Sequence, residues 1–258
     1  MESTMESDAR TQIKLHQLLT TLKVNSENYI TLYVKPSSFP YYINELSLAP
    51  PHSIYADEIK EAVGMKAITQ GIEKYNTGAA IYWPENGNKY IVLPPFPITE
   101  DKITIGEIDT SLLCTALEDK YIIGIVLVTW GTYSIGIFDQ GNLMESKTGT
   151  GHIHKEHKKG GSSAKRFARR TEEQRKDFLR KVSNRIDERF KDHKIDYIFF
   201  GGNRLILKPL LKECKCPELA PYKISDRILD VRHANKDALT HSLHEITKSV
   251  VFTFCDYT

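Results

Sequence analysis

Two apolar runs separated by a long amphipathic stretch constrain the fold more than any other feature of the chain. The first run, YIIGIVLV at 121–128, is continuous, as expected of a strand buried on both faces. The second, DYIFFGG at 196–202, predicts another buried strand. The stretch between them predicts a long helix, whose apolar face carries Phe178, Leu179, Val182, Ile186 and Phe190. This alternation indicates an α/β domain.

Flanking segments extend this unit into a mixed sheet with packed helices. The alternating segment 132–138 and the turn DQGN predict a hairpin whose second strand starts at Leu143. Helices are expected at 204–213 and 236–246, with a third strand, RILDV, at 227–231. The expected fold class is α/β (α+β), in two domains. We place the boundary near residue 118, which makes the second domain 119–258.

Residues 1–118 are predicted to form a separate small α/β domain. A strand is expected at 29–35, and an Asn-Gly turn joins two further strands as a hairpin at 78–96. Helices are expected at 11–22 and at 57–75, the latter interrupted at Gly64. Residues 94–109 are interpreted as an extended connector that contributes nothing to the core.

Composition and targeting signals indicate a protein of the reducing cytoplasm. The first ten residues, MESTMESDAR, have no apolar segment of the kind found in signal peptides. No apolar run reaches the ~20 residues that span a bilayer. The four cysteines, at 114, 214, 216 and 255, are too few and too scattered for a disulfide framework. We expect a cytoplasmic protein with no membrane partner, monomeric when free.

Positive charge is concentrated in one segment of the chain. Residues 151–186 contain twelve Lys or Arg against four Asp or Glu, although the whole chain has a net charge of only +2. Such a concentration indicates a polyanionic partner, in this case a nucleic acid. The alternative is a solvated helix face.

Two adjacent glycines lie inside this basic segment, just before the long helix. Gly160 and Gly161 lack a Cβ, so their backbone can approach a ligand closely. The N–H groups at the start of the helix would suit an anion or an oxyanion. The residues expected to contact RNA are Lys155, Lys158, Lys159, Ser163, Lys165, Arg166, Arg169 and Arg170.

Three other kinds of chemistry were weighed against RNA binding. Ser162 and Lys165 fit the S-x-x-K pattern, and KTG occurs at 147–149, but their order is wrong for a penicillin-binding-type acyltransferase. His152, His154 and His157, with the Cys214–Cys216 pair, match no closed zinc signature, and the surrounding lysines would repel a cation. No phosphate-binding G-x-x-x-x-G-K-[ST] motif is present. We therefore expect neither a metal nor another cofactor.

The segment KKGGSSAKRFARRTEEQRKDFLRKV, residues 158–182, resembles the catalytic segment of eukaryotic and archaeal class-1 peptide-chain release factors. In that family a Gly-Gly-Gln tripeptide precedes a serine, an alanine and an Arg-Phe-Ala-Arg helix. The matching positions here are Gly160, Gly161, Ser163, Ala164, Arg166, Phe167, Ala168 and Arg169. The apolar strand segments resemble the same domain, so the resemblance covers most of residues 119–258.

Three departures from that family narrow the expected function. Ser162 stands in the position of the glutamine, and the first domain contains neither Asn-Ile-Lys-Ser nor Tyr-x-Cys-x-x-x-Phe, the stop-codon-reading motifs. The chain also ends where a third domain would begin. The resemblance therefore implies a codon-independent peptidyl-tRNA hydrolase of ribosome rescue and quality control, with Gly160, Gly161 and Ser162 as catalytic residues. Its partners would be the large ribosomal subunit, ribosomal RNA and peptidyl-tRNA. The alternative is a non-catalytic factor that occupies the peptidyl-transferase centre.

Overall fold

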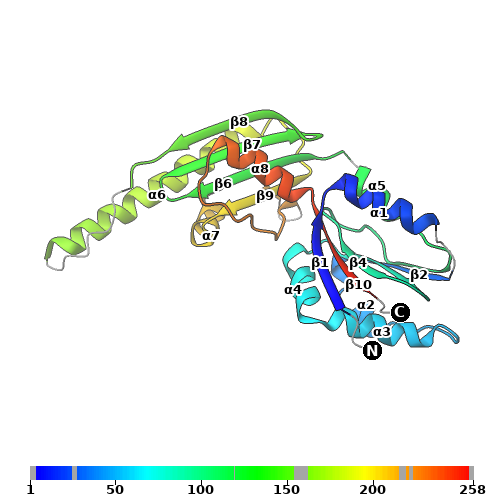
Figure 1. The fold of residues 1–258 in the computed structure, drawn as a ribbon. Helices are drawn as coiled ribbons and strands as arrows, with labels where there is room; N and C mark the ends of the chain where they lie inside the picture. The colour runs from blue at the N-terminus through cyan, green and yellow to red at the C-terminus, as the bar shows by residue number, and fades with distance from the viewer. Residues whose placement is uncertain are drawn as a thin grey trace. The chain divides into compact units, whose positions relative to one another are not determined.

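The computed structural model describes residues 4–24, 28–118, 120–153, 162–214, 219–220 and 223–255. Within these residues the strands form two sheets, which belong to two compact units (Figure 1). Unit 1 comprises Met1–Asp119 with Ile246–Thr258, and unit 2 comprises Lys120–Glu245. Both units combine helices with a sheet, so the expected α/β (α+β) class is confirmed.

Unit 1 is a sheet with helices on both faces. Its strand order is β1-β10-β4-β3-β2-β5, and the paired strands run antiparallel. The strands are β1 Thr4–Arg10, β2 Tyr29–Val34, β3 Ala79–Pro84, β4 Lys89–Leu93, β5 Lys102–Gly106 and β10 Ser249–Cys255. The helices are α1 Gln12–Val24, α2 Tyr41–Asn44, α3 Ser53–Gly64, α4 Lys66–Tyr75 and α5 Ser111–Glu118, with a short 3-10 helix, η1, at Pro36–Ser38.

Strand β2 contributes side chains to the hydrophobic cores on both faces of the sheet. Ile30 and Leu32 face a core built with α2, α3 and α4, whereas Tyr29 and Tyr33 face a second core built with α1 and α5. Successive side chains of a strand point to opposite faces, so every residue of this central strand is buried. The expected strand at 29–35, the hairpin of β3 with β4, and the helix interruption at Gly64 are confirmed.

Three strands of unit 1, namely β1, β5 and β10, were not expected from the sequence. Residues 102–106, interpreted as part of a connector, form the edge strand β5, which pairs with β2. Its side chains alternate between half-buried and exposed, so the sequence carries little burial signal there. Strand β10 pairs with both β1 and β4, which places residues 246–258 in unit 1. The expected second domain, 119–258, was therefore too long at its C-terminal end, because a strand pairing across the whole chain leaves no local pattern.

Unit 2 is a four-stranded sheet in the order β8-β7-β6-β9. Its strands are β6 Ile122–Thr129, β7 Thr132–Asp139, β8 Asn142–Thr150 and β9 Tyr197–Gly202, and its helices are α6 Ser162–Phe190, α7 Arg204–Glu213 and α8 Lys236–Ile246. Strand β9 runs parallel to β6 while β7 and β8 are antiparallel, so the sheet is mixed, as expected. The apolar stripe of α6 predicted from the sequence is fully buried against one sheet face, together with α7.

The strand expected at 227–231 is not formed. Leu229 makes a single parallel bridge to Gly201, and Ile224 makes another to Ile198. Arg227 instead donates from Nη2 to the Glu245 carbonyl at 2.7 Å. Around its bridge the Leu229 amide donates to the Phe200 carbonyl at 2.9 Å and its carbonyl accepts from the Gly202 amide at 3.0 Å, so the segment is bonded to β9 locally without forming a continuous strand.

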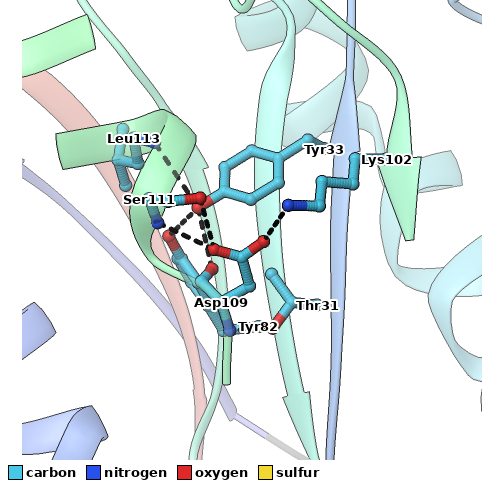
Figure 2. Close-up of polar contacts among 7 residues, drawn as sticks. All are labelled: Thr31, Tyr33, Tyr82, Lys102, Asp109, Ser111 and Leu113. Carbon is cyan, nitrogen blue, oxygen red and sulfur yellow. Dashed lines mark hydrogen bonds and ion pairs between the residues drawn. The ribbon is translucent and has the colours of Figure 1, made fainter. Parts of the chain in front are cut away.

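A buried polar cluster fixes the connection between β5 and α5 (Figure 2). The Tyr33 hydroxyl lies 3.0 Å from that of Tyr82 and donates to the Asp109 carbonyl at 2.8 Å. The Asp109 carboxylate accepts from the Ser111 amide at 2.9 Å and pairs with Lys102 at 2.7 Å. Burial alone would raise the pKa of Asp109, but the hydrogen bonds from Lys102 and Ser111 outweigh it and hold that pKa below its ordinary value.

Asp109→Asn is therefore expected to change how stability depends on pH. Because the folded-state pKa lies below the unfolded value of ~3.9, the carboxylate contributes stability that is fully present above that value and is lost as pH falls through the folded pKa. Urea unfolding at pH 7 should show the variant less stable than the wild type, and the difference should shrink below pH ~4. A difference that stays constant down to pH 3 would contradict this assignment.

Candidate functional site

The candidate site is the basic arm, defined as residues 152–170, which links β8 to α6. Of the predicted site residues, Lys155, Lys158, Lys159, Gly160 and Gly161 lie outside the described residues. Ser162 and Ser163 form the start of α6. Lys165, Arg166, Arg169 and Arg170 follow on the same helix, and all four side chains are exposed.

The first turns of α6 carry positive charge and run out beyond the sheet (Figure 1). Residues 165–170 are all exposed, whereas Thr171 is 3% exposed and begins the part of the helix that packs on unit 2. No acidic residue lies in the first turn. Cations near a helix N-terminus oppose the helix dipole, so an anion bound there would relieve the repulsion. The arm thus presents the charge expected of a phosphate-binding surface.

The nearest acidic side chains on α6 moderate this charge only weakly. Arg169 pairs with Glu173 at 3.4 Å, with both side chains more than half exposed. Exposed pairs of this kind contribute little, because water and salt screen them. Arg169 can therefore exchange this partner for a phosphate.

The root of the arm is built from two glycines that face aromatic rings, a feature not anticipated from the sequence. A Cβ placed on Gly149 would lie 2.4 Å from the Tyr133 ring, and one on Gly151 would lie 2.4 Å from the Phe178 ring. Gly149 belongs to the KTG triplet that suggested an acyltransferase. In the structure this triplet lies in β8, where Gly149 makes room for Tyr133.

Further contacts join this root to α6. The Trp130 and Tyr133 rings lie 6.3 and 6.2 Å from that of Phe178, and the Arg175 guanidinium lies 5.1 Å from the Trp130 ring centroid. Phe178 is buried, whereas Phe167, in the first turns of the same helix, is 47% exposed.

At its other end, β8 is held to α6 by charge. Glu145 accepts one hydrogen bond from Arg189, and Nε2 of His193 lies within hydrogen-bonding distance of its other carboxylate oxygen, at 3.2 Å. The hydrogen bond from Arg189, followed by that from His193, holds the pKa of Glu145 below its ordinary value despite partial burial. The strand that leads into the arm is thus attached to the helix that leads out of it at both ends.

Of the histidines and cysteines named above as possible zinc ligands, the described part of the chain contains His152 and Cys214. Within it, no group of three or more His, Cys, Asp or Glu residues is arranged to hold a metal ion. His154, His157 and Cys216 of the weighed zinc set lie outside it. None of the described helices combines the length and apolarity needed to cross a membrane.

Residues 122–251 match a family model described as Actinobacteria/chloroflexi VLRF1 release factor. Among solved structures, an archaeal translation termination factor, aRF1, is 16% identical; the match covers 92% of this chain and 70% of that one, with a TM-score of 0.40. A Vms1 mitochondrial localization core is 11% identical, with 84% and 89% covered and a TM-score of 0.34. Pelota of Archaeoglobus fulgidus is 11% identical, with 95% and 64% covered and a TM-score of 0.32. No curated protein matches the chain.

Proposed function

The chain belongs to the Actinobacteria/chloroflexi VLRF1 release factor family, and on that basis we propose that it is a ribosome-associated, codon-independent peptidyl-tRNA hydrolase. It would release nascent peptides from stalled ribosomes or from large subunits. The ligands of the basic arm would be ribosomal RNA and the acceptor end of peptidyl-tRNA.

The observation that carries this proposal is the exposed cationic start of α6. Lys165, Arg166, Arg169 and Arg170 are all exposed on a helix whose remaining length is packed on the sheet. A rigid projection with cations at its tip suits a narrow channel lined by phosphates. In the sequence the glycine pair immediately precedes this helix, and residues without a Cβ would let the backbone approach the reacting ester closely.

The proposed chemistry is hydrolysis of the ester that joins the peptide to the 3′ oxygen of tRNA. A water oxygen attacks the carbonyl carbon, negative charge develops on the carbonyl oxygen, and the bond to the 3′ oxygen then breaks. The leaving 3′ oxygen takes up a proton as the water loses one. A backbone N–H at Ser162 would stabilise the developing charge, and removal of one such donor costs about 3–4 kcal/mol in other enzymes. Support comes from the position of Ser162 as the first residue of α6, where N–H groups have no acceptor within the helix.

A second function is favoured by one specific residue. Ser162 replaces the glutamine of the release-factor tripeptide, so the side chain that would help to position water is missing. A protein with this change could bind the empty peptidyl-transferase centre without hydrolysis. The two functions differ in whether peptide is released.

The test is release of labelled peptide from isolated large subunits that carry peptidyl-tRNA. We expect the wild-type protein to release the peptide, and to do so equally from intact ribosomes with a sense codon or a stop codon in the decoding site. Strict dependence on a stop codon would overturn codon independence. Tight, salt-sensitive binding without release would establish the non-catalytic function instead.

A further inference from the structure

The contacts at the root of the basic arm join the end of β8, the turn between β6 and β7, and α6. We propose that Trp130, Tyr133, Gly149, Gly151 and Phe178 form a positioning device, here named the aromatic clamp, that sets the direction in which the basic arm leaves unit 2. This inference rests on the proposed function, because the direction matters only if the tip of the arm must reach a reacting ester. None of the five residues is assigned a chemical step.

At positions 149 and 151 the space of a side chain is already occupied, by the Tyr133 ring and the Phe178 ring respectively. A Cβ at 2.4 Å from a ring carbon is far inside contact distance, so any residue but glycine would displace an aromatic ring. Neither glycine occupies a left-handed conformation, so close approach, rather than backbone freedom, accounts for their presence.

Both ends of the arm are held close to the end of β8 and to the turn between β6 and β7. On the outgoing side, the Gly151 amide donates to the Gly131 carbonyl at 2.8 Å, which fixes the end of β8 to the turn between β6 and β7. On the returning side, Lys181 donates from Nζ to the Thr150 carbonyl at 2.8 Å. The Arg175 guanidinium covers the face of Trp130, a favourable cation–π contact, and so adds a link from α6 to the same turn.

At ~1.5 Å per residue, Ser162 lies ~24 Å along the α6 axis from Phe178 and ~13 Å beyond Thr171, the first buried residue of α6 from position 165 onward. A tilt of ~5° about Phe178 would therefore move Ser162 by ~2 Å. Displacement of a catalytic group by ~1 Å can reduce a rate by ~10²-fold. The clamp is placed where a small change of angle has a large effect at the tip.

The experiment compares Gly151→Ala with Gly124→Ala. Both substitutions push against an aromatic ring of α6, because a Cβ on Gly124 would lie 2.8 Å from the Phe190 ring, near the other end of the helix. We expect Gly151→Ala to lower kcat for release by at least tenfold while its Kd for large subunits stays within about twofold of wild type. Gly124→Ala should destabilise the fold and leave kcat of the folded fraction unchanged. Adding Phe178→Leu to Gly151→Ala should restore at least fivefold of the lost rate, since the smaller side chain makes room for the new methyl group.

A measurement without ribosomes separates this inference from the proposed function. Nitroxide labels at Ala168→Cys and Asn142→Cys, both exposed, report the distance from the arm to the start of β8 once the four native cysteines are replaced by serine. Gly151→Ala should broaden or shift the distance distribution, and the double variant should restore it. An unchanged distribution in Gly151→Ala would overturn the clamp, whether or not the wild type releases peptide. Equal losses of kcat in Gly151→Ala and Gly124→Ala would overturn it as well.

Discussion

Gly161→Ala is expected to lower peptide release from large subunits by ~10²–10³-fold, the cost of losing one oxyanion donor. An alanine methyl group would hold the backbone away from the ester and would restrict the loop conformations that glycine allows. Binding to the subunit should change by less than about twofold, because no charge is removed. Single-turnover release with saturating protein measures the first quantity, and filter binding measures the second.

Two further variants serve as controls for the Gly161→Ala result. Gly64→Ala, at the end of α3, places a methyl group in open space and should release peptide at the wild-type rate. Ser162→Ala keeps the backbone N–H and should retain most of the activity. If Ser162→Ala alone abolished release, the hydroxyl would take part in the chemistry, and the backbone mechanism proposed for Ser162 would be wrong.

Removal of the four exposed cations between residues 165 and 170, at the start of α6, is expected to weaken binding to large subunits by ~10²-fold at ~0.1 M salt. Each phosphate contact contributes about 0.7–0.9 to the slope of log K against log salt, so the combined alanine variant of Lys165, Arg166, Arg169 and Arg170 should lose ~3 units of slope. Affinity measured across a salt series gives both values. The affinity depends on salt because each cation that contacts an RNA phosphate directly releases a counterion from the RNA.

The matched control removes the same charge elsewhere. Alanine at Lys14, Lys23, Lys66 and Lys74 changes the net charge equally, and these four exposed lysines lie on α1 and α4 of unit 1. This variant should keep the wild-type slope. Equal slopes for both quadruple variants would mean that net charge alone, and no particular surface, governs binding, and the assignment of the arm would then be withdrawn.

Periodicity predicted the parts of the fold that bury a whole face within one segment. The α6 stripe from Phe178 to Phe190 and the continuous run in β6 satisfy this condition, and both were located correctly. Strand β5 does not, because Ile103 and Ile105 remain 38% and 46% exposed at the sheet edge. Leu229 was misassigned for the opposite reason: its segment is apolar enough for a strand but forms only an isolated bridge.

The candidate site likewise has features that could be predicted from the sequence and features that could not. The cations of the arm were found from the sequence because charge concentration needs no knowledge of contacts. The root of the arm was not found from the sequence. The role of Gly149 and Gly151 becomes visible only in the structure, where Tyr133 and Phe178 occupy the space that their side chains would need. A glycine two residues before another, at the end of a strand that precedes a basic segment, is the one signal that could have indicated it.

The pairing of β10 with β1 and β4 has a consequence for synthesis of the protein. The second sheet is complete once residues 120–245 have been made, since its strands and covering helices are contiguous in the chain. The first sheet has to wait, because the place between β1 and β4 stays vacant until residues 249–255 emerge. Contacts between such distant segments form slowly, and unpaired strand edges invite association with other chains. The segment made first is therefore among the last to reach its folded state, and a nascent chain stalled before residue 249 would expose two open edges.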